Sequence, residues 1–158
     1  MEKTIDLLYI LQNLGFTVIF VGLIGFERQR KHKMAGLTTH ILVALGAAGI
    51  TLVQELMVQD AILFIRENPD LAKNVMIERQ RIIAQIVTGV GFLGAGAILK
   101  TNGYISGLTT ASSLWISAII GIIFGLGYTQ LGIVVSLLAL IVLTIVKKLF
   151  PVHYDNTK

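Results

Sequence analysis

Three polar side chains lie at helical spacing inside an apolar stretch in the middle of the chain. Arg81, Gln85 and Thr88 would project from one face of a helix. Inside a bilayer such groups are costly unless they find partners, and they usually face protein or water. Two interpretations stay open: hydrogen bonds between helices, or the lining of a path for a ligand or ion.

A dense set of glycines continues the same stretch. Gly89, Gly91, Gly94 and Gly96 would let helix backbones approach closely, or would break the helix and free backbone carbonyls inside a cavity. No strand precedes them, so they do not form the phosphate-binding loop of a dinucleotide fold. Close packing is the simpler interpretation, and a broken helix would favour binding.

Charged and titratable groups gather between the first two apolar stretches. Glu27 and Lys31 are four residues apart, in the order that favours an ion pair at a helix end. The bases from Arg28 to Lys33 also suit anionic lipid. His40 lies one turn into the second stretch, where a histidine is a functional candidate by default and a hydrogen bond to a neighbouring helix is the alternative.

Small residues recur at every fourth position of a later stretch. Because small residues let helices pack closely in lipid, this pattern predicts a packing seam rather than chemistry. It leaves open whether the seam closes within one chain or between the two chains of a homodimer. The four residues are Ser113, Ser117, Gly121 and Gly125.

Known catalytic and metal-binding patterns are absent from the sequence. The chain has no cysteine, and no Asp or Glu falls within its apolar stretches, although Mg²⁺ prefers carboxylate and water oxygens. It has no Walker loop, no His-Glu-x-x-His and no Ser/His/Asp motif. We therefore expect no enzymatic activity, no cofactor and no metal site.

The composition indicates where these residues lie. Of the 158 residues, 54% are hydrophobic and 14% are charged, against roughly 25% charged in soluble domains. About 20 apolar residues cross a bilayer as a helix, so we expect an all-α polytopic membrane protein of about five spans in one transmembrane domain. The spans are expected at 7–26, 36–53, 82–99, 108–127 and 131–146, with an outside loop and interfacial helices at 54–81 and a cytoplasmic tail at 151–158.

The basic residues predict the orientation. One side of the bilayer would hold eight Lys and Arg and the other side five, and the richer side is cytoplasmic. The N-terminus is therefore expected outside and the C-terminus inside, and bases that flank apolar stretches do not predict nucleic-acid binding. The eight are Arg28, Arg30, Lys31, Lys33, Lys100, Lys147, Lys148 and Lys158, and the five are Lys3, Arg66, Lys73, Arg79 and Arg81.

Two pairs of short motifs indicate an internal repeat. Gly25-Phe26 is echoed by Gly91-Phe92, and Gly36-Leu-Thr-Thr39 is echoed by Gly107-Leu-Thr-Thr110. Spans one and three would then run in the same direction, as would spans two and four. The sequence therefore predicts a parallel repeat of two helix pairs, related by a two-fold axis along the membrane normal, plus a fifth helix.

Four of these segments together resemble the MgtC/SapB membrane family. They are Val21-Gly-Leu-Ile-Gly-Phe-Glu-Arg-Gln-Arg30, Ala35-Gly-Leu-Thr-Thr-His40, Arg81-Ile-Ile-Ala-Gln-Ile-Val-Thr-Gly-Val-Gly-Phe-Leu-Gly-Ala-Gly96 and Gly107-Leu-Thr-Thr-Ala-Ser-Ser-Leu-Trp115. The resemblance implies a bacterial inner-membrane protein linked to growth in low magnesium, to virulence, and to partners such as the F-type ATP synthase or a sensor kinase. By position it implies functional roles for Glu27, Arg28, Gly36, Thr39, His40, Arg81, Gln85, Gly91, Gly94, Gly96, Thr109 and Thr110.

The chain departs from the family pattern in two places. By this resemblance we expect the short SapB type, without the cytoplasmic C-terminal domain of MgtC-type members. Thr38 stands where many members have Arg, which removes a positive charge from the cytoplasmic entrance.

Three hypotheses about function result. The first is a non-enzymatic regulator that alters another membrane protein through helix packing. The second is a small transporter or channel for Mg²⁺ or an anion, with Arg81 and Gln85 at its outer mouth and Thr88 in its middle. Thr39, His40, Thr109 and Thr110 would line its cytoplasmic side. The third is a purely structural membrane subunit.

Overall fold

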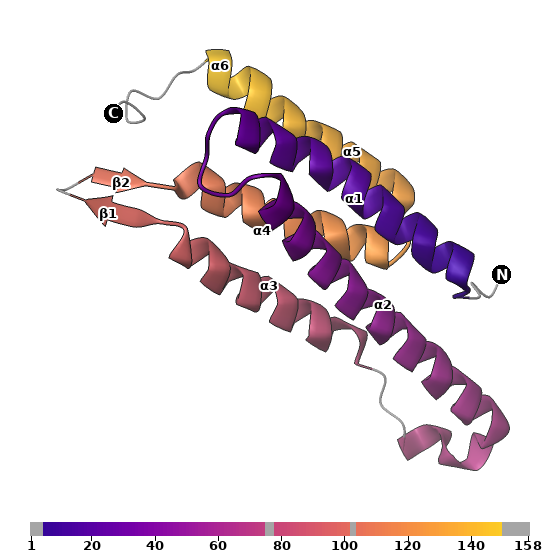
Figure 1. Ribbon diagram of the computed structural model, residues 1–158. Coiled ribbons are helices and arrows are strands. Elements are labelled where there is room, and N and C mark those ends of the chain that lie inside the picture. Colours follow the sequence, from indigo (N-terminus) through magenta and orange to yellow (C-terminus); the bar gives the residue numbers. More distant parts are fainter. Residues whose placement is uncertain (1–4, 75–77, 102–103, 150–158) are drawn as a thin grey trace.

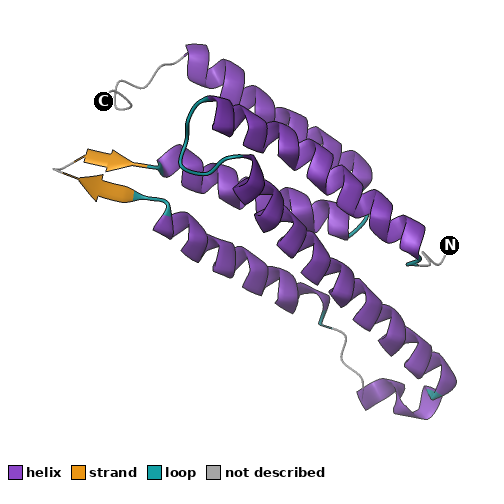
Figure 2. Ribbon diagram, viewed as in Figure 1, coloured by secondary structure: helices purple, strands orange, loops and turns teal. Residues whose placement is uncertain are grey.

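The computed structural model describes residues 5–74, 78–101 and 104–149. The described chain is a bundle of long helices, which confirms the all-α expectation (Figures 1 and 2). The tail at 151–158, Lys3 and Lys158 lie outside the described residues. The main helices are α1 (Leu7–Arg30), α2 (Leu37–Glu67), α3 (Arg79–Gly96), α4 (Leu108–Gly125) and α5 (Thr129–Ile141).

Local sequence signals set the ends of α1 and the start of α2. The Asp6 carboxylate accepts a hydrogen bond from the backbone N–H of Tyr9 at 2.8 Å, which caps the start of α1. After Arg30 the chain reverses, and His32 takes the left-handed conformation with φ 49°. Gly36 then precedes the first turn of α2.

The second helix is longer than the span expected at 36–53. α2 has 31 residues, or about 46 Å at 1.5 Å per residue, which exceeds the roughly 30 Å of hydrocarbon in a bilayer. Residues 54–67, expected within an outside loop that carries interfacial helices, continue α2 without a break. Nothing breaks it before Asn68, because Pro69 is the first residue that disfavours the helical conformation of its neighbour. A short 3₁₀ helix, η1 (Pro69–Asn74), follows.

A small hairpin joins α3 to α4, and the sequence analysis did not predict it. Strand β1 (Leu99–Thr101) pairs antiparallel with β2 (Tyr104–Ser106), so Leu99, expected at the end of the third span, lies in a strand. Gly107 closes this connection with φ 86°, and a Cβ there would overlap the carbonyl oxygen of Ala97.

Helix α4 lies at the centre of the bundle. It packs against α2 along most of its length and also contacts α1, α3 and α5. On one side Phe124 stacks against Phe16 and Phe20, with ring centroids 5.9 and 5.7 Å away. On the other side Ala118 and Ile122 form a second apolar core with residues of α2 and α3.

The helix directions agree with the predicted repeat. Figure 1 shows α1 and α3 running the same way, and α2 and α4 running the opposite way. The fifth helix continues past Ile141 through a π-helical turn, η2 (Val142–Val146), into α6 (Lys147–Leu149).

Four of the described helical segments are long and apolar enough to cross a membrane. They are α1, α2, α4 and the run 129–146. Helix α3, at one edge of the bundle (Figure 1), is not among them. Its first turns contain Arg79, Gln80, Arg81 and Gln85, which lower its mean hydropathy.

Candidate functional site

The end of α1 places an acid and a base inside the bundle. Arg28 is fully buried, and the Glu27 side chain is only 9% exposed. The guanidinium Nη1 of Arg28 lies 3.6 Å from Oε2 of Glu27. Lys31 forms an ion pair with the other carboxylate oxygen of Glu27, which confirms the predicted helix-end pair.

The Arg28 guanidinium makes few polar contacts for a buried charge. None of its three nitrogens has a hydrogen-bond partner among the described residues. A buried charge is costly unless it is paired and hydrogen-bonded. The pair with Glu27 is therefore its main electrostatic stabilisation among the described residues.

His40 connects α2 to α4 beside this pair. Its Nδ1 lies 2.7 Å from the Gly36 carbonyl oxygen, and its Nε2 lies 3.0 Å from Oγ of Ser113. A carbonyl oxygen only accepts, so Nδ1 carries a proton. The hydrogen bond to a neighbouring helix, one of the two interpretations of this histidine, is thus present.

The Ser113 hydroxyl has two alternative acceptors. It lies 2.9 Å from the Thr110 carbonyl oxygen, and one hydroxyl donates only one hydrogen bond. If it donates to Thr110, then Nε2 of His40 donates to Ser113 and the imidazole is protonated. If it donates to Nε2, the imidazole is neutral. The contact therefore couples the proton on His40 to the rotamer of one hydroxyl.

These residues form one buried cluster near the turn between α1 and α2. Glu27 and Arg28 lie in the last turn of α1 and His40 lies in the first turn of α2, so all three are at the same end of the bundle. We call this set the buried cluster, and its members are Glu27, Arg28, His40, Thr110 and Ser113. Its two neighbours in the family motifs, Thr39 and Thr109, are exposed and lie outside it.

Gly36 has a local role next to the cluster. The Gln29 side chain folds over it, and Oε1 of Gln29 accepts a hydrogen bond from the backbone N–H of Leu37 at 3.1 Å. A Cβ on Gly36 would lie 3.2 Å from that same oxygen. The glycine therefore leaves room for the side chain that caps α2.

The polar stripe of α3 lies apart from the buried cluster. Arg81, Gln85 and Thr88 are all exposed. Arg81 pairs with Glu78 at 3.2 Å, and the Thr88 hydroxyl donates to the Ala84 carbonyl oxygen at 2.9 Å. The stripe shares a helix, as expected, but the described structure does not join it to His40 and Thr110 in one path.

The glycines of α3 do not break the helix. Gly94 packs against Ala111 of α4, with 3.6 Å from a Cβ built on it to the Ala111 Cβ. A Cβ at Gly89, Gly91 or Gly96 would meet no atom within 4 Å. One glycine therefore serves helix packing inside the chain, and the other three face open space.

The seam on α4 closes within the chain. Ser113, Ser117, Gly121 and Gly125 are all buried. A Cβ on Gly121 would overlap the Ala44 carbonyl oxygen of α2, and one on Gly125 would lie 2.8 Å from that of Ala48. The alternative left open by the sequence is thereby resolved, because α2 already covers this face of α4.

Several buried polar residues on α1 and α2 were not predicted from the sequence. Asn13 and Thr17 lie one turn apart on α1, and Thr51 and Gln54 lie on α2. Nδ2 of Asn13 and both polar atoms of the Gln54 amide have no hydrogen-bond partner among the described residues. Polar types at helical spacing within the first span were a usable signal for Asn13 and Thr17. Gln54 was hidden because it was assigned to a loop.

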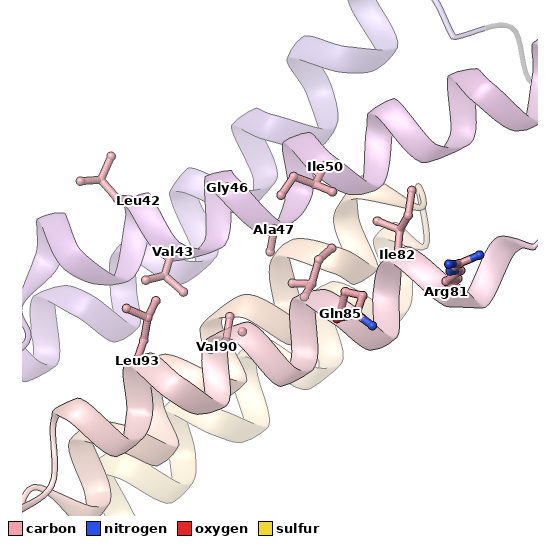
Figure 3. Close-up of a pocket in the computed structure, with 12 residues that line it drawn as sticks. Leu42, Val43, Gly46, Ala47, Ile50, Arg81, Ile82, Gln85, Val90 and Leu93 are labelled. Carbon is pink, nitrogen blue, oxygen red and sulfur yellow. The ribbon is translucent and has the colours of Figure 1, made fainter.

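An open groove runs between α2 and α3, and we call it the α2–α3 groove. Its volume is about 700 Å³. Figure 3 shows Val43 of α2 and Leu93 of α3 directed toward one another, with Arg81 and Gln85 toward one end. Within the described part of the chain, no three His, Cys, Asp or Glu side chains are grouped so that they could hold a metal ion.

Comparison with known proteins gives a consistent assignment. A family model described as the MgtC family matches residues 14–151. The chain is 42% identical over 131 residues to the "Putative magnesium transporter YhiD" of Escherichia coli K12, which covers 83% of this chain and 57% of that protein. It is 38% identical to "Protein MgtC" of Brucella abortus strain 2308, over 83% of this chain and 48% of that protein.

A third relative gives the same result. "Protein MgtC" of Salmonella typhimurium LT2 is 39% identical over 139 residues, which cover 88% of this chain and 52% of that protein. The chain thus spans about half the length of the curated relatives it matches. No solved structure matches it.

Proposed function

The chain belongs to the MgtC family, and from this premise we propose that it is a non-enzymatic regulator of other membrane proteins in adaptation to low magnesium or phosphate. Its long apolar helices and its family make it a multi-pass membrane protein. The magnesium connection is supported by the name of the Escherichia coli relative. The proposed setting is the bacterial inner membrane, with the N-terminus outside and the C-terminus in the cytoplasm.

The outer face of α3 carries this proposal. Ala84, Thr88, Gly91 and Ala95 follow one another at helical spacing, and all four are exposed. We call this line the α3 ridge. Small residues let a second helix approach closely in lipid. Helices α2 and α4 also pack against α3, but a Cβ on Gly91 would meet no atom within 4 Å.

The composition of α3 supports a protein partner rather than lipid on this face. Among the described helical segments, α1, α2, α4 and the run 129–146 are long and apolar enough to cross a membrane. Helix α3 is not one of them. Polar groups in a membrane are usually covered by protein or water. The α4 seam is already filled by α2, so the proposed docking surface is the α3 ridge and not that seam.

The family resemblance suggests what the partner is. The F-type ATP synthase and a sensor kinase are the proposed classes, and a second copy of this chain is the alternative. All of them offer membrane helices that fit a small-residue ridge.

Site-specific photocrosslinking tests the proposal. A photoreactive residue at Thr88 or Gly91 is expected to crosslink to a different membrane protein in cells grown at low magnesium. The matched control is Leu138 on α5, which is 56% exposed and lies outside the ridge. Equal crosslinking from the ridge and from the control would contradict the proposal, and crosslinks to the same chain alone would favour a homodimer.

Transport is the second candidate, and the buried polar residues favour it. Charged and polar side chains lie inside the bundle on α1, α2 and α4, and polar groups within membrane proteins often mark ion pathways. This interior route differs from the path predicted along α3.

Ion flux into proteoliposomes separates these routes. Mg²⁺, protons and phosphate would be measured with the unmodified protein and with the Arg28→Gln and Gln85→Leu variants. Flux lost only in Arg28→Gln would support the interior route, and flux lost only in Gln85→Leu would support the α3 route. Absence of flux from folded protein would leave regulation as the function.

A further inference from the structure

The α2–α3 groove has a shape and a polarity that the proposed regulatory function does not use. Its walls are apolar and come from both helices, with Leu42 and Ile50 from α2 and Ile82 and Leu93 from α3. Gly46 lies in one wall, and a Cβ built on it would meet no atom within 4 Å. The volume of about 700 Å³ falls in the usual range of small-ligand sites, roughly 300–1,000 Å³.

Polar groups are confined to one end of the groove. Arg81 and Gln85 lie toward the end where α3 begins (Figure 3), and the remaining lining residues are apolar. Both polar side chains offer N–H donors, and an Arg guanidinium suits a phosphate in particular. The groove therefore has a donor-rich head and an apolar body.

The length of the groove matches one leaflet of a bilayer. The lining of α3 runs from Arg81 to Leu93, about 18 Å at 1.5 Å per residue. Half of the roughly 30 Å hydrocarbon core is about 15 Å. A molecule with its phosphate at Arg81 would therefore reach the bilayer midplane near Leu93.

We propose that the α2–α3 groove holds a phospholipid, with its phosphate at Arg81 and Gln85 and one acyl chain along the apolar walls. The pair between Arg81 and Glu78 does not prevent this. It is solvent-exposed, with side chains 77% and 54% accessible, and exposed pairs are weak. A phosphate oxygen can replace or join the Glu78 carboxylate at the guanidinium.

A helix from a second copy fits the groove less well. Close helix packing in membranes needs small residues at the contact, and the groove edges carry Leu42, Ile50 and Leu93, each at least half exposed. These branched side chains keep a second backbone at a distance but leave space for a thin acyl chain. The charge at one end also matches the polarity of a lipid.

Native mass spectrometry of the detergent-purified protein tests the proposal. The probes are phosphatidylglycerol and a diacylglycerol with the same acyl chains, titrated separately. The unmodified protein is expected to bind one phosphatidylglycerol per chain about tenfold more tightly than the diacylglycerol, since charged hydrogen bonds to the phosphate contribute only to the first. Equal affinity for the two lipids would overturn the proposal.

Two pairs of variants locate the site. Arg81→Gln is expected to remove the preference for phosphatidylglycerol, whereas Lys100→Gln, in β1 beyond the other end of α3, retains it. Gly46→Leu fills the groove and is expected to lower binding of both lipids at least tenfold, whereas Gly49→Leu does not. Gly49 is a matched control because a Cβ there also meets no atom within 4 Å and it does not line the groove.

The remaining outcomes also decide the proposal. Unchanged lipid binding in both Arg81→Gln and Gly46→Leu would overturn it. Loss of a dimer in Gly46→Leu, with lipid binding intact, would assign the groove to a second copy of the chain. None of these results depends on whether the α3 ridge binds a regulatory partner.

Discussion

Replacement of Gly121 by alanine tests how α4 packs at the centre of the bundle. A Cβ on Gly121 would overlap the Ala44 carbonyl oxygen and would lie 3.0 Å from the carbonyl carbon and 3.1 Å from the Cα of the same residue. All three atoms belong to the backbone of α2, so no side-chain rotation relieves the contact. The two helices must move apart along their whole interface.

The magnitude follows from two opposing terms. Overpacking a tight interface costs about 1–3 kcal/mol, whereas alanine in place of glycine favours the helix by up to about 1 kcal/mol. Gly121→Ala is therefore expected to lower the free energy of unfolding by about 1–2 kcal/mol. Gly15→Ala on α1 gains the same helix propensity without the clash, because a Cβ there meets no atom within 4 Å. Its free energy of unfolding should therefore be unchanged or slightly higher.

Unfolding of the purified protein in detergent micelles, followed by circular dichroism, measures both variants. The difference between them isolates the packing cost and should be about 1–3 kcal/mol. A Gly121→Ala protein as stable as Gly15→Ala would refute the close approach of α2 and α4. It would then follow that the seam faces lipid or another chain.

Three further predictions concern the buried cluster and the hairpin. His40→Ala removes two hydrogen bonds and should destabilise the protein by roughly 2–4 kcal/mol in thermal unfolding, whereas Ser113→Ala should cost about 1–2 kcal/mol. Equal losses in the two variants would contradict the bridging role of the His40 ring. Arg28→Met leaves the Glu27 carboxylate buried without its neighbouring guanidinium and should lower the free energy of unfolding by about 3 kcal/mol. Adding Glu27→Gln should restore part of that stability. No recovery in the double variant would show that the two charges are not coupled. Gly107→Ala combines a left-handed φ with an overlap and should cost at least about 1–2 kcal/mol; unchanged denaturant unfolding would argue against the hairpin connection.

Local features of this protein could be predicted from its sequence because they depend on residues close together in the chain. Apolar runs near 20 residues indicated the helices, and the spacing of Glu27 and Lys31 predicted an ion pair that forms within one turn of α1. The helical alignment of Arg81 with Gln85 is local for the same reason. Each family motif is a contiguous segment of the chain, so the resemblance could be detected without knowledge of the fold.

Contacts between distant segments were decided only by the tertiary structure. The sequence marked His40 and Ser113 separately, but their contact depends on how α2 crosses α4, 73 residues apart in the chain. The α4 seam and the α3 ridge are both lines of small residues, and composition cannot distinguish the line that a neighbour fills from the one left open. The groove beside Arg81 exists because two helices stand apart, and the distance between helices is set by the packing of the whole bundle rather than by any one segment.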